Sequence, residues 1–371
     1  MTSTPNAVDI NKRLYSLDFM RGLIMFLLVL ESTGIFKVFF LASKDHFLEN
    51  IFIQFQHHPW HGMRFWDLIQ PGFMFIAGTA MAYSIQNQQQ KNIATKEITL
   101  KTIKRSGWLF FWGVLSYAVK DTGLSFELWN VLTQLSFTML VAYFIYEWQI
   151  KSQIIFCIAL LILTDLLYRY TNVPGYNLGF TNHFNFGNYM DMLLMNKTSR
   201  GGWVAINCIP TSVHTIAGAL IGKLLLNSQV QKVKIKQMVY WGLGVLILGY
   251  ALDVFQINPI IKRIATSSFT LVSLGWCILF FAASYYFIDI KQNKKILFLR
   301  ILSLNSIFIY LFFETAGGGW LNTYVKKFAF GLLNNFTTSE TFIAQIGCIL
   351  IFFIEWGLCY FLYKKKIFFK L

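Results

Sequence analysis

The chain alternates long apolar runs with short polar stretches. About ten runs approach the length of about 20 helical residues that crosses a hydrocarbon core of about 30 Å. In order they are Leu17–Leu41, Leu68–Ile85, Gly107–Val119, Leu128–Tyr146, Ile154–Tyr170, Trp203–Leu226, Met238–Ile257, Ala265–Ile288, Ile301–Ala316 and Phe342–Tyr363. Backbone exposed to lipid must satisfy its own hydrogen bonds, so each run is predicted to be a helix. The third and ninth runs are short, which indicates tilted or partly re-entrant segments.

Two longer polar stretches interrupt this pattern. One spans residues 43–66, and the other spans residues 171–202 and is rich in Asn, Gly and aromatic residues. The length of the second stretch is typical of a functional or a disordered loop, and its aromatic residues argue against disorder. We therefore expect one membrane-embedded domain over residues 1–371. Helices one to five lie over about 17–170, an outer loop over 171–202, and helices six to ten over about 203–363.

Composition supports a membrane protein and excludes a soluble one. Apolar residues make up 56% of the chain and charged residues only 13%, and the mean hydropathy is +0.51. A soluble globular protein has roughly 25% charged residues to cover its surface. The predicted fold class is therefore an all-α polytopic membrane protein, with about ten transmembrane helices in two five-helix halves.

The net charge of +15 sets the expected topology. Basic residues accumulate in cytoplasmic loops, which explains this charge better than nucleic-acid binding does, so no nucleic-acid partner is expected. With both termini cytoplasmic, roughly two thirds of the Lys and Arg residues lie inside. The pair Lys262 and Arg263 is an exception, because it falls outside. The five cysteines are odd in number and form no C-x-x-C motif, so neither a disulfide framework nor a zinc site is indicated.

Ionisable residues inside predicted spans are costly and are candidates for function. Asp18 and Arg21 lie three residues apart on the first helix and share a face. They form either an ion pair at the helix entry or a site for a phosphate-bearing ligand. Glu31 lies farther along this helix, where it either pairs with an outer base or reaches water. His214, inside the sixth helix, is expected to be a hydrogen-bonded bundle residue.

Four of the six histidines fall in the first polar stretch: His46, His57, His58 and His61. Asp67 follows them and opens the second helix, where a carboxylate is also favourable as an N-terminal charge. A metal site and a general base oriented by an acid are both compatible with this cluster. No H-x-x-x-H pattern lies on a confidently predicted helix, so no metal is expected.

Two segments carry a resemblance to a known family. RLYSLDFMRGLIMFLLVL and HHPWHGMRFWDLIQPGFMFIAGTAMAYS resemble the transmembrane acyltransferases of the heparan-alpha-glucosaminide N-acetyltransferase family and its bacterial relatives of unknown function. The first matches the pattern S-L-D-x-x-R-G, and the second matches a His-Trp-Gly-Asp-Pro block with its spacing intact. NYMDMLL, NPIIKRIATSSF and LSLNSIFIYLFFE also look like family segments, so the likeness covers nearly the whole chain.

The resemblance implies about ten helices, with acetyl-CoA entering from the cytoplasm and an amino-sugar acceptor on the outer side. It places the active-site histidine on His57 and its carboxylate partner on Asp67. Three departures stand out. His61 replaces a usual Asn, Glu31 or Ser32 stands where another Asn is usual, and WNVLTQLSF lacks two arginines of the family's fourth helix.

We therefore expect an acetyl-CoA-dependent acyltransferase in the cytoplasmic membrane of a bacterium, acting on an outer sugar or amino sugar. His57 is the predicted general base or transient nucleophile, and Asp67 orients it. Candidate donor-binding residues, which are equally helix-packing residues, are Asp18, Arg21 and Asn305. Candidate acceptor-binding residues are Trp60, His61, Glu31, Asn188, Tyr189 and Asp191, and the aromatic ones are also compatible with an interfacial belt.

Besides the two substrates, the expected partner is the lipid bilayer. A homodimer with a second copy of the chain is left open. Two other functions remain open from the sequence. One is a proton-coupled transporter, in which intramembrane carboxylates form a relay. The other is an inactive protein that binds a glycan.

Overall fold

The computed structural model describes residues 14–120, 123–293 and 296–369. The protein is mostly helical, at 73%. In this described part, six helices are long and apolar enough to cross a membrane, or up to eight if each of two bent helix pairs is one span. The prediction of an all-α multi-pass membrane protein is confirmed at this level. The predicted count of ten and the cytoplasmic termini stay predictions, and Lys12, Arg13 and Lys370 lie outside the described residues.

The predicted spans differ from the observed helices where the chain bends or carries charge. The first span consists of α1 (Tyr15–Ser32) and α2 (Ile35–Ala42), which meet at 65°. Gly34, between them, has a φ of 83°, a left-handed conformation that glycine adopts without steric cost. The ninth span is likewise bent, by 74° after α12 (Leu297–Leu304). The third span, Gly107–Val119, begins inside α5 (Thr95–Ser116) and extends past its end, and the first half of α5 carries several Lys and Arg residues.

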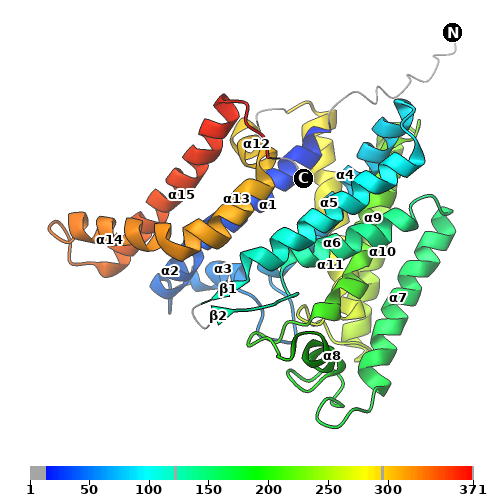
Figure 1. Ribbon diagram of the computed structural model, residues 1–371, viewed down its shortest axis with the longest axis horizontal. Helices are drawn as coiled ribbons and strands as arrows, with labels where there is room; N and C mark the ends of the chain where they lie inside the picture. Colours follow the sequence, from blue (N-terminus) through cyan, green and yellow to red (C-terminus); the bar gives the residue numbers. More distant parts are fainter. Residues whose placement is uncertain (1–13, 121–122, 294–295, 370–371) are drawn as a thin grey trace. The chain divides into compact units, whose positions relative to one another are not determined.

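The chain divides into two compact units (Figure 1), which do not follow the predicted halves. The first unit contains residues 58–63 and 67–291, drawn from cyan to yellow. The second contains residues 15–57, 64–66 and 292–371, drawn in blue, orange and red. The second unit joins the N-terminal helix to the C-terminal ones because α1 packs against α12. At Gly22 an added Cβ would lie 2.3 Å from the Leu299 carbonyl oxygen.

The elements of the first unit are α4 (Ile69–Gln90), α5, β1 (Val119–Lys120), β2 (Gly123–Leu124), α6 (Val131–Phe144), α7 (Ile150–Tyr170), α8 (Phe186–Met195), η3 (Ala205–Asn207), α9 (Cys208–Leu226), α10 (Gln231–Val254), α11 (Ser267–Ser284) and η4 (Tyr285–Ile290). The two short strands pair in an antiparallel register, with Val119 opposite Leu124. The turn η2 (Phe65–Leu68) precedes α4.

The elements of the second unit are α1, α2, α3 (Glu49–Phe52), η1 (Ile53–Phe55), α12, α13 (Ser306–Phe312), η5 (Phe313–Leu321), α14 (Asn322–Leu333) and α15 (Glu340–Lys364). Of these, η5 is a π-helix. Aromatic edges pack α1 against its neighbours, because Phe26 contacts both Phe298 and Phe352 with ring centroids 5.8 and 5.5 Å apart.

The first unit is held by close helix contacts and by buried hydrogen bonds. An added Cβ at Gly78 would lie 1.9 Å from the Thr215 carbonyl oxygen, so α4 and α9 approach to backbone distance. His214 is fully buried on α9, and its Nε2 lies 2.8 Å from Ser273 Oγ on α11. The prediction that His214 is a hydrogen-bonded bundle residue is confirmed. Hydrogen bonds between neutral polar side chains, such as His214 and Ser273, therefore connect these helices.

The helices of the first unit bring three polar segments to one end. Helices α4, α6, α9 and α11 begin at the end where α7 and α10 finish, since consecutive helices alternate in direction. Residues 58–63, Asp67, and residues 168–207 and 253–266 therefore meet there, and we call this region the loop end. An isolated bridge between His61 and Ile261 and a hydrogen bond from Trp60 Nε1 to the Phe180 carbonyl connect the three segments.

Candidate functional site

The long polar stretch at the loop end contains a short helix. Asn185 caps α8, because its side chain accepts a hydrogen bond from the Asn188 backbone N–H at 3.2 Å. Asn196 ends the helix in a left-handed conformation with φ 52°. This helix lies inside the predicted outer loop over 171–202. The Asn-rich composition that indicates a loop also supplies both ends of α8.

An apolar cluster fixes the segments of the loop end to one another. Its buried members are Tyr168, Val204, Ile261 and Ile264, and Trp60 packs against them. The Trp60 indole N–H donates to the Phe180 carbonyl at 2.9 Å, so this side chain is anchored at both its ring and its polar edge. These contacts give the loop end a rigid base from which polar side chains project.

A buried ion pair lies above this base. Lys262 Nζ is 3.5 Å from Asp67 Oδ1, and the two side chains are only 6% and 1% exposed. The His58 backbone N–H also donates to Asp67 Oδ2 at 3.2 Å. Burial lowers the pKa of Lys262 to about 8, although the neighbouring Asp67 carboxylate opposes this shift. Lys262 is therefore an amine that can change its protonation near neutral pH.

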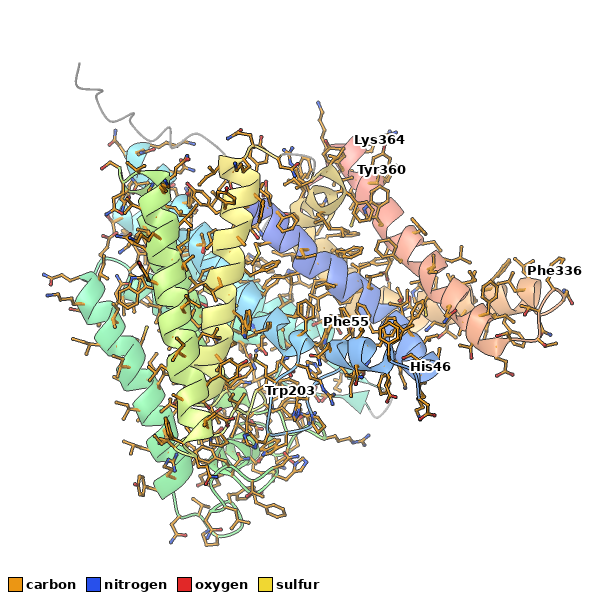
Figure 2. The ribbon with its side chains drawn as sticks, turned by 180° about the vertical axis from the view of Figure 1, so that it is seen from behind. His46, Phe55, Trp203, Phe336, Tyr360 and Lys364 are labelled. Carbon is orange, nitrogen blue, oxygen red and sulfur yellow. The ribbon has the colours of Figure 1, made fainter. Side chains whose placement is uncertain are left out.

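Trp203, labelled in Figure 2, has two cations beside its ring. Lys262 Nζ is 5.1 Å from its ring centroid and the Arg263 guanidinium carbon is 5.7 Å away. The Arg263 guanidinium donates to the Gly201 carbonyl oxygen, while its Nε is buried and has no hydrogen-bond partner in the described part of the chain. Burial lowers the pKa of Arg263, and Asp67 opposes this shift. The Asp67 carboxylate thus forms an ion pair with Lys262 and also interacts electrostatically with Arg263.

Asp191 joins three segments of the first unit. From α8 it accepts the Ala205 backbone N–H at 2.8 Å and the Trp129 indole N–H at 3.1 Å. Burial raises the pKa of Asp191 to about 7, and these two hydrogen bonds offset part of the shift. The carboxyl therefore positions the start of α9 and the segment before α6, and it titrates near neutral pH.

Asn188 is the most unusual polar group of the loop end. It is fully buried, and neither its amide oxygen nor its amide nitrogen has a hydrogen-bond partner among the described residues. Three further buried oxygen atoms have no hydrogen-bond partner among the described residues: Tyr168 Oη, Asn182 Oδ1 and Asn207 Oδ1. Each unsatisfied buried group costs about 1–3 kcal/mol. Buried polar groups of this kind are usually satisfied by ordered water.

Glycine keeps space beside two of these groups. An added Cβ at Gly187 would lie 2.4 Å from Tyr168 Oη, and one at Gly202 would lie 2.2 Å from Asn182 Oδ1. Gly202 also has a φ of 75°, which other residues rarely adopt. The backbone therefore approaches the polar groups as closely as packing allows.

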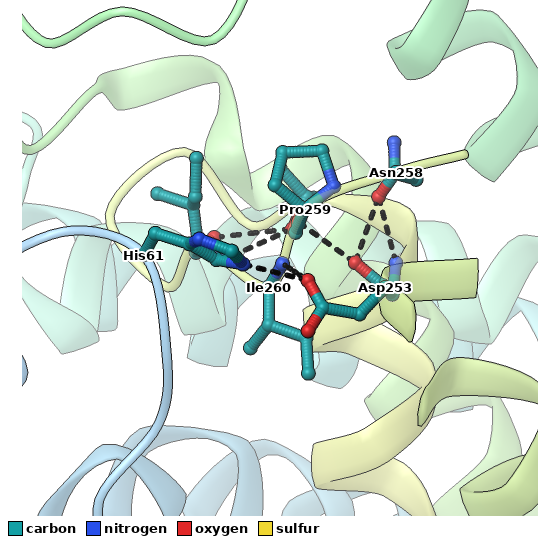
Figure 3. Close-up of polar contacts among 8 residues, drawn as sticks. His61, Asp253, Asn258, Pro259 and Ile260 are labelled. Carbon is teal, nitrogen blue, oxygen red and sulfur yellow. Dashed lines mark hydrogen bonds and ion pairs between the residues drawn. The ribbon is translucent and has the colours of Figure 1, made fainter. Parts of the chain in front are cut away.

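His61 is held by Asp253 from the end of α10 (Figure 3). Its Nε2 lies 2.7 Å from Asp253 Oδ1, which also accepts the Ile260 backbone N–H at 2.9 Å. The Gly62 backbone N–H donates to the Ile260 carbonyl at 2.8 Å, and the His61 side chain is 59% exposed. The segment after the histidine cluster is thus fixed to the α10–α11 connection, and His61 presents its ring to solvent.

The structure divides the predicted site residues between the two units. The first unit contains Asp67, Trp60, His61, Asn188, Tyr189 and Asp191, whereas the second contains His57, Asp18, Arg21, Asn305 and Glu31. His57 is exposed, and its carbonyl accepts a hydrogen bond from Arg64 Nη1 at 2.9 Å. The pairing of His57 with Asp67 stays a prediction.

The predicted donor-binding residues lie on α1 and beside α13. Asp18 is buried and Arg21 is half-buried on α1, while Glu31 is exposed near the end of that helix. The Asn305 amide contacts the C-terminal segment, because Nδ2 donates to the Ile367 carbonyl at 3.2 Å and Oδ1 accepts the Phe369 N–H at 3.0 Å. These bonds give Asn305 the packing role. Donor binding by these residues stays a prediction.

Sequence reasoning missed Lys262, Arg263, Trp203 and Asn207 as members of the loop end. A sequence signal for two of them was present: Lys262 and Arg263 are the basic pair that breaks the expected inside bias.

In residues 14–120, 123–293 and 296–369, no three His, Cys, Asp or Glu side chains are grouped so that they could hold a metal ion.

Comparison with known proteins adds no relative. No protein-family model and no curated protein matches this chain.

Proposed function

We propose that the protein is a membrane acyltransferase that moves an acetyl group from cytoplasmic acetyl-CoA to a sugar or amino sugar on the outer side. The proposal includes ten helices, cytoplasmic termini and a place in the cytoplasmic membrane of a bacterium. Its activity and donor come from the resemblance of the two N-terminal motifs to the acyltransferase family. The loop end supplies the support for a carbohydrate acceptor.

The partnerless amide of buried Asn188 is the observation that carries the acceptor assignment. Sugars present many hydroxyl groups, and amide and tyrosine side chains can bind them with both donors and acceptors. Trp60 and Trp203 add aromatic surface beside these groups, suited to the apolar face of a sugar ring. A polar ligand would therefore remove the cost of the unsatisfied groups at the loop end.

The proposed chemistry needs one base and one site for negative charge. The acceptor amine or hydroxyl attacks the thioester carbonyl carbon, His57 takes the acceptor proton, and the carbon–sulfur bond breaks. His57 then returns that proton to the departing CoA thiolate. In this scheme Asp67 orients the base. Alternatively, His57 accepts the acetyl group first and passes it on.

Lys262 and Asp191 would support this chemistry from the loop end. Lys262, held by Asp67, keeps a cation and a carboxylate together at the loop end. Asp191 keeps the start of α9 in place through the Ala205 N–H. These residues are positioning and electrostatic groups in the proposal, whereas His57 carries the proton.

The test compares His57→Ala with His46→Ala, a histidine of the same polar stretch. Membranes containing each variant are supplied with radiolabelled acetyl-CoA and glucosamine, and labelled product is measured alongside the amount of inserted protein. We expect His57→Ala to lose product while His46→Ala retains it. Retention of transfer by His57→Ala removes that residue from the mechanism. Absence of transfer in the unmodified protein contradicts the proposed activity under these conditions.

A further inference from the structure

A second polar site lies within the second unit, where α1 breaks. Ser32 is the last residue of α1, and two side chains reach it from other helices. Its Oγ lies 3.4 Å from Glu355 Oε2 on α15, and its carbonyl accepts the Asn322 Nδ2–H at 2.9 Å from the start of α14. None of these residues belongs to the loop end of the first unit.

Both side chains that meet Ser32 have an oxygen atom without a hydrogen-bond partner in the described part of the chain. Glu355 is fully buried and its Oε1 lacks a partner, while Asn322 is 8% exposed and its Oδ1 lacks one. An added Cβ at Gly317 would lie 2.9 Å from Glu355 Oε1, so glycine leaves the space that this oxygen uses. Two acceptor oxygens, Glu355 Oε1 and Asn322 Oδ1, thus lack a donor in the side chains that contact Ser32.

The elements that pack in the second unit carry further charged and titratable residues. They are Cys359 on α15, Glu31 on α1, Glu314 on η5, Lys326 on α14, Arg300 on α12 and Lys37 on α2. Arg300 lies over the Tyr15 ring at 5.9 Å, and Lys326 acts electrostatically on Cys348. No Lys or Arg of the described residues is within ion-pair distance of Glu355.

These contacts leave an ionised Glu355 without a compensating cation. A buried carboxylate in that condition costs several kcal/mol, and the cost is greatest inside an apolar span. A proton on Oε1 removes the charge and turns one of the partnerless acceptors into a donor. No group of three metal-binding side chains occurs in the described part of the chain, so a bound proton fits better than a coordinated metal.

We propose that Glu355, Ser32 and Asn322 form a proton-binding site, with Glu355 as the proton carrier. Release is a simple exchange, in which the carboxyl loses its O–H proton to water and becomes a carboxylate. The site joins α15 to the 65° bend of α1 and to the π-helix η5, and π-helical segments often occur at functional positions. Ionisation would favour entry of water beside Oε1 and strengthen the hydrogen bond that the Ser32 hydroxyl donates to Oε2, linking protonation to this bend.

The experiment is infrared difference spectroscopy on the full chain in lipid vesicles, recorded between about pH 5 and about pH 9. Glu340→Gln is the matched control, because Glu340 is on the same helix and is exposed. We expect a protonated-carboxyl band that disappears as pH rises in the parent protein and in Glu340→Gln. All of these proteins carry Asp191→Asn as background, because the Asp191 carboxyl titrates in the same pH range. Glu355→Gln in that background should lack the band.

Three results would overturn the proposal. The first is persistence of the band in Glu355→Gln. The second is a carboxylate signal from Glu355 over the whole pH range that shifts when sodium chloride is added, which would indicate a bound cation and not a proton. The third concerns Gly317→Ala, whose methyl group would crowd Oε1. We expect this variant to move the titration midpoint of the band by roughly one pH unit, and an unchanged midpoint would remove Gly317 and Glu355 from a common site. The experiment contains no acetyl-CoA, so its outcome is independent of the proposed acyl transfer.

Discussion

Replacing Lys262 with methionine removes the cation of the buried pair at the loop end while keeping much of its length. At 3.5 Å the attraction between Lys262 and Asp67 is about 5 kcal/mol for an effective dielectric constant of about 20. Burial works against it. The lowering of the Lys262 pKa from 10.5 to about 8 corresponds to about 3 kcal/mol against the charged form.

Because attraction and burial oppose each other, the intact pair contributes little to the free energy of unfolding. Removing only one of the two partners is costly, because the other charge stays buried without it. Lys262→Met leaves the Asp67 carboxylate buried with less compensation, and we expect a loss of about 3–5 kcal/mol in the free energy of unfolding. The double variant Asp67→Asn/Lys262→Met removes both charges and should recover at least half of that loss. The coupling between the two positions should therefore be at least about 1.5–2.5 kcal/mol, which is half of the loss in Lys262→Met.

The assay is unfolding of the purified variants by detergent titration in mixed micelles, followed by tryptophan fluorescence. A loss below about 1 kcal/mol in Lys262→Met, or a double variant as unstable as the sum of the two single ones, would refute this reasoning. The pH dependence gives an independent check. Unfolded Lys262 holds its proton up to about pH 10.5 and the folded one only to about pH 8, so its contribution to stability rises between these values. Lys262→Met should lose that rise.

The remaining predictions use the same unfolding assay. Asp191 binds its proton more tightly when folded, with a pKa of about 7 against 3.8, so stability should fall as pH rises from about 4 to about 7, and Asp191→Asn should flatten this dependence. Gly78→Ala should destabilise strongly, because its Cβ would lie 1.9 Å from the Thr215 carbonyl, whereas Gly244→Ala, which meets nothing within 4 Å, should be neutral or stabilising by about 1 kcal/mol. His61→Ala removes the side-chain contact between Nε2 and Asp253 from a ring that is 59% exposed, and it should cost at most about 1 kcal/mol; a larger loss would show that this contact organises the loop end.

Hydropathy predicted the helical membrane architecture because lipid imposes a long, continuous signal on each span. It did not predict the break at Gly34, since the apolar pattern continues from α1 into α2 and only a backbone conformation separates them. It also placed the start of the third helix at Gly107, whereas α5 begins at Thr95, because the charged first half of this helix gives no apolar signal. Local backbone geometry and charge placement decide these points, and a window average hides both.

At the loop end, sequence reasoning found individual polar residues but not their partners. Asn188 and Asp191 were predicted for a ligand, yet Asp191 also binds Ala205 and Trp129, which lie far away along the chain. The partner of Asp67 lies almost two hundred residues later, at Lys262, and no local spacing could indicate it. The unexpected outer position of Lys262 was the one usable signal.

The central claim is that an acetyl group crosses from a cytoplasmic donor to an outer acceptor. Membrane vesicles whose cytoplasmic face points inward can be loaded with labelled acetyl-CoA while glucosamine is supplied only outside. The account predicts labelled acceptor in the external medium, and its loss when the vesicles contain His57→Ala. Transfer that occurs only with donor and acceptor on the same side, or that continues unchanged in His57→Ala, would contradict it.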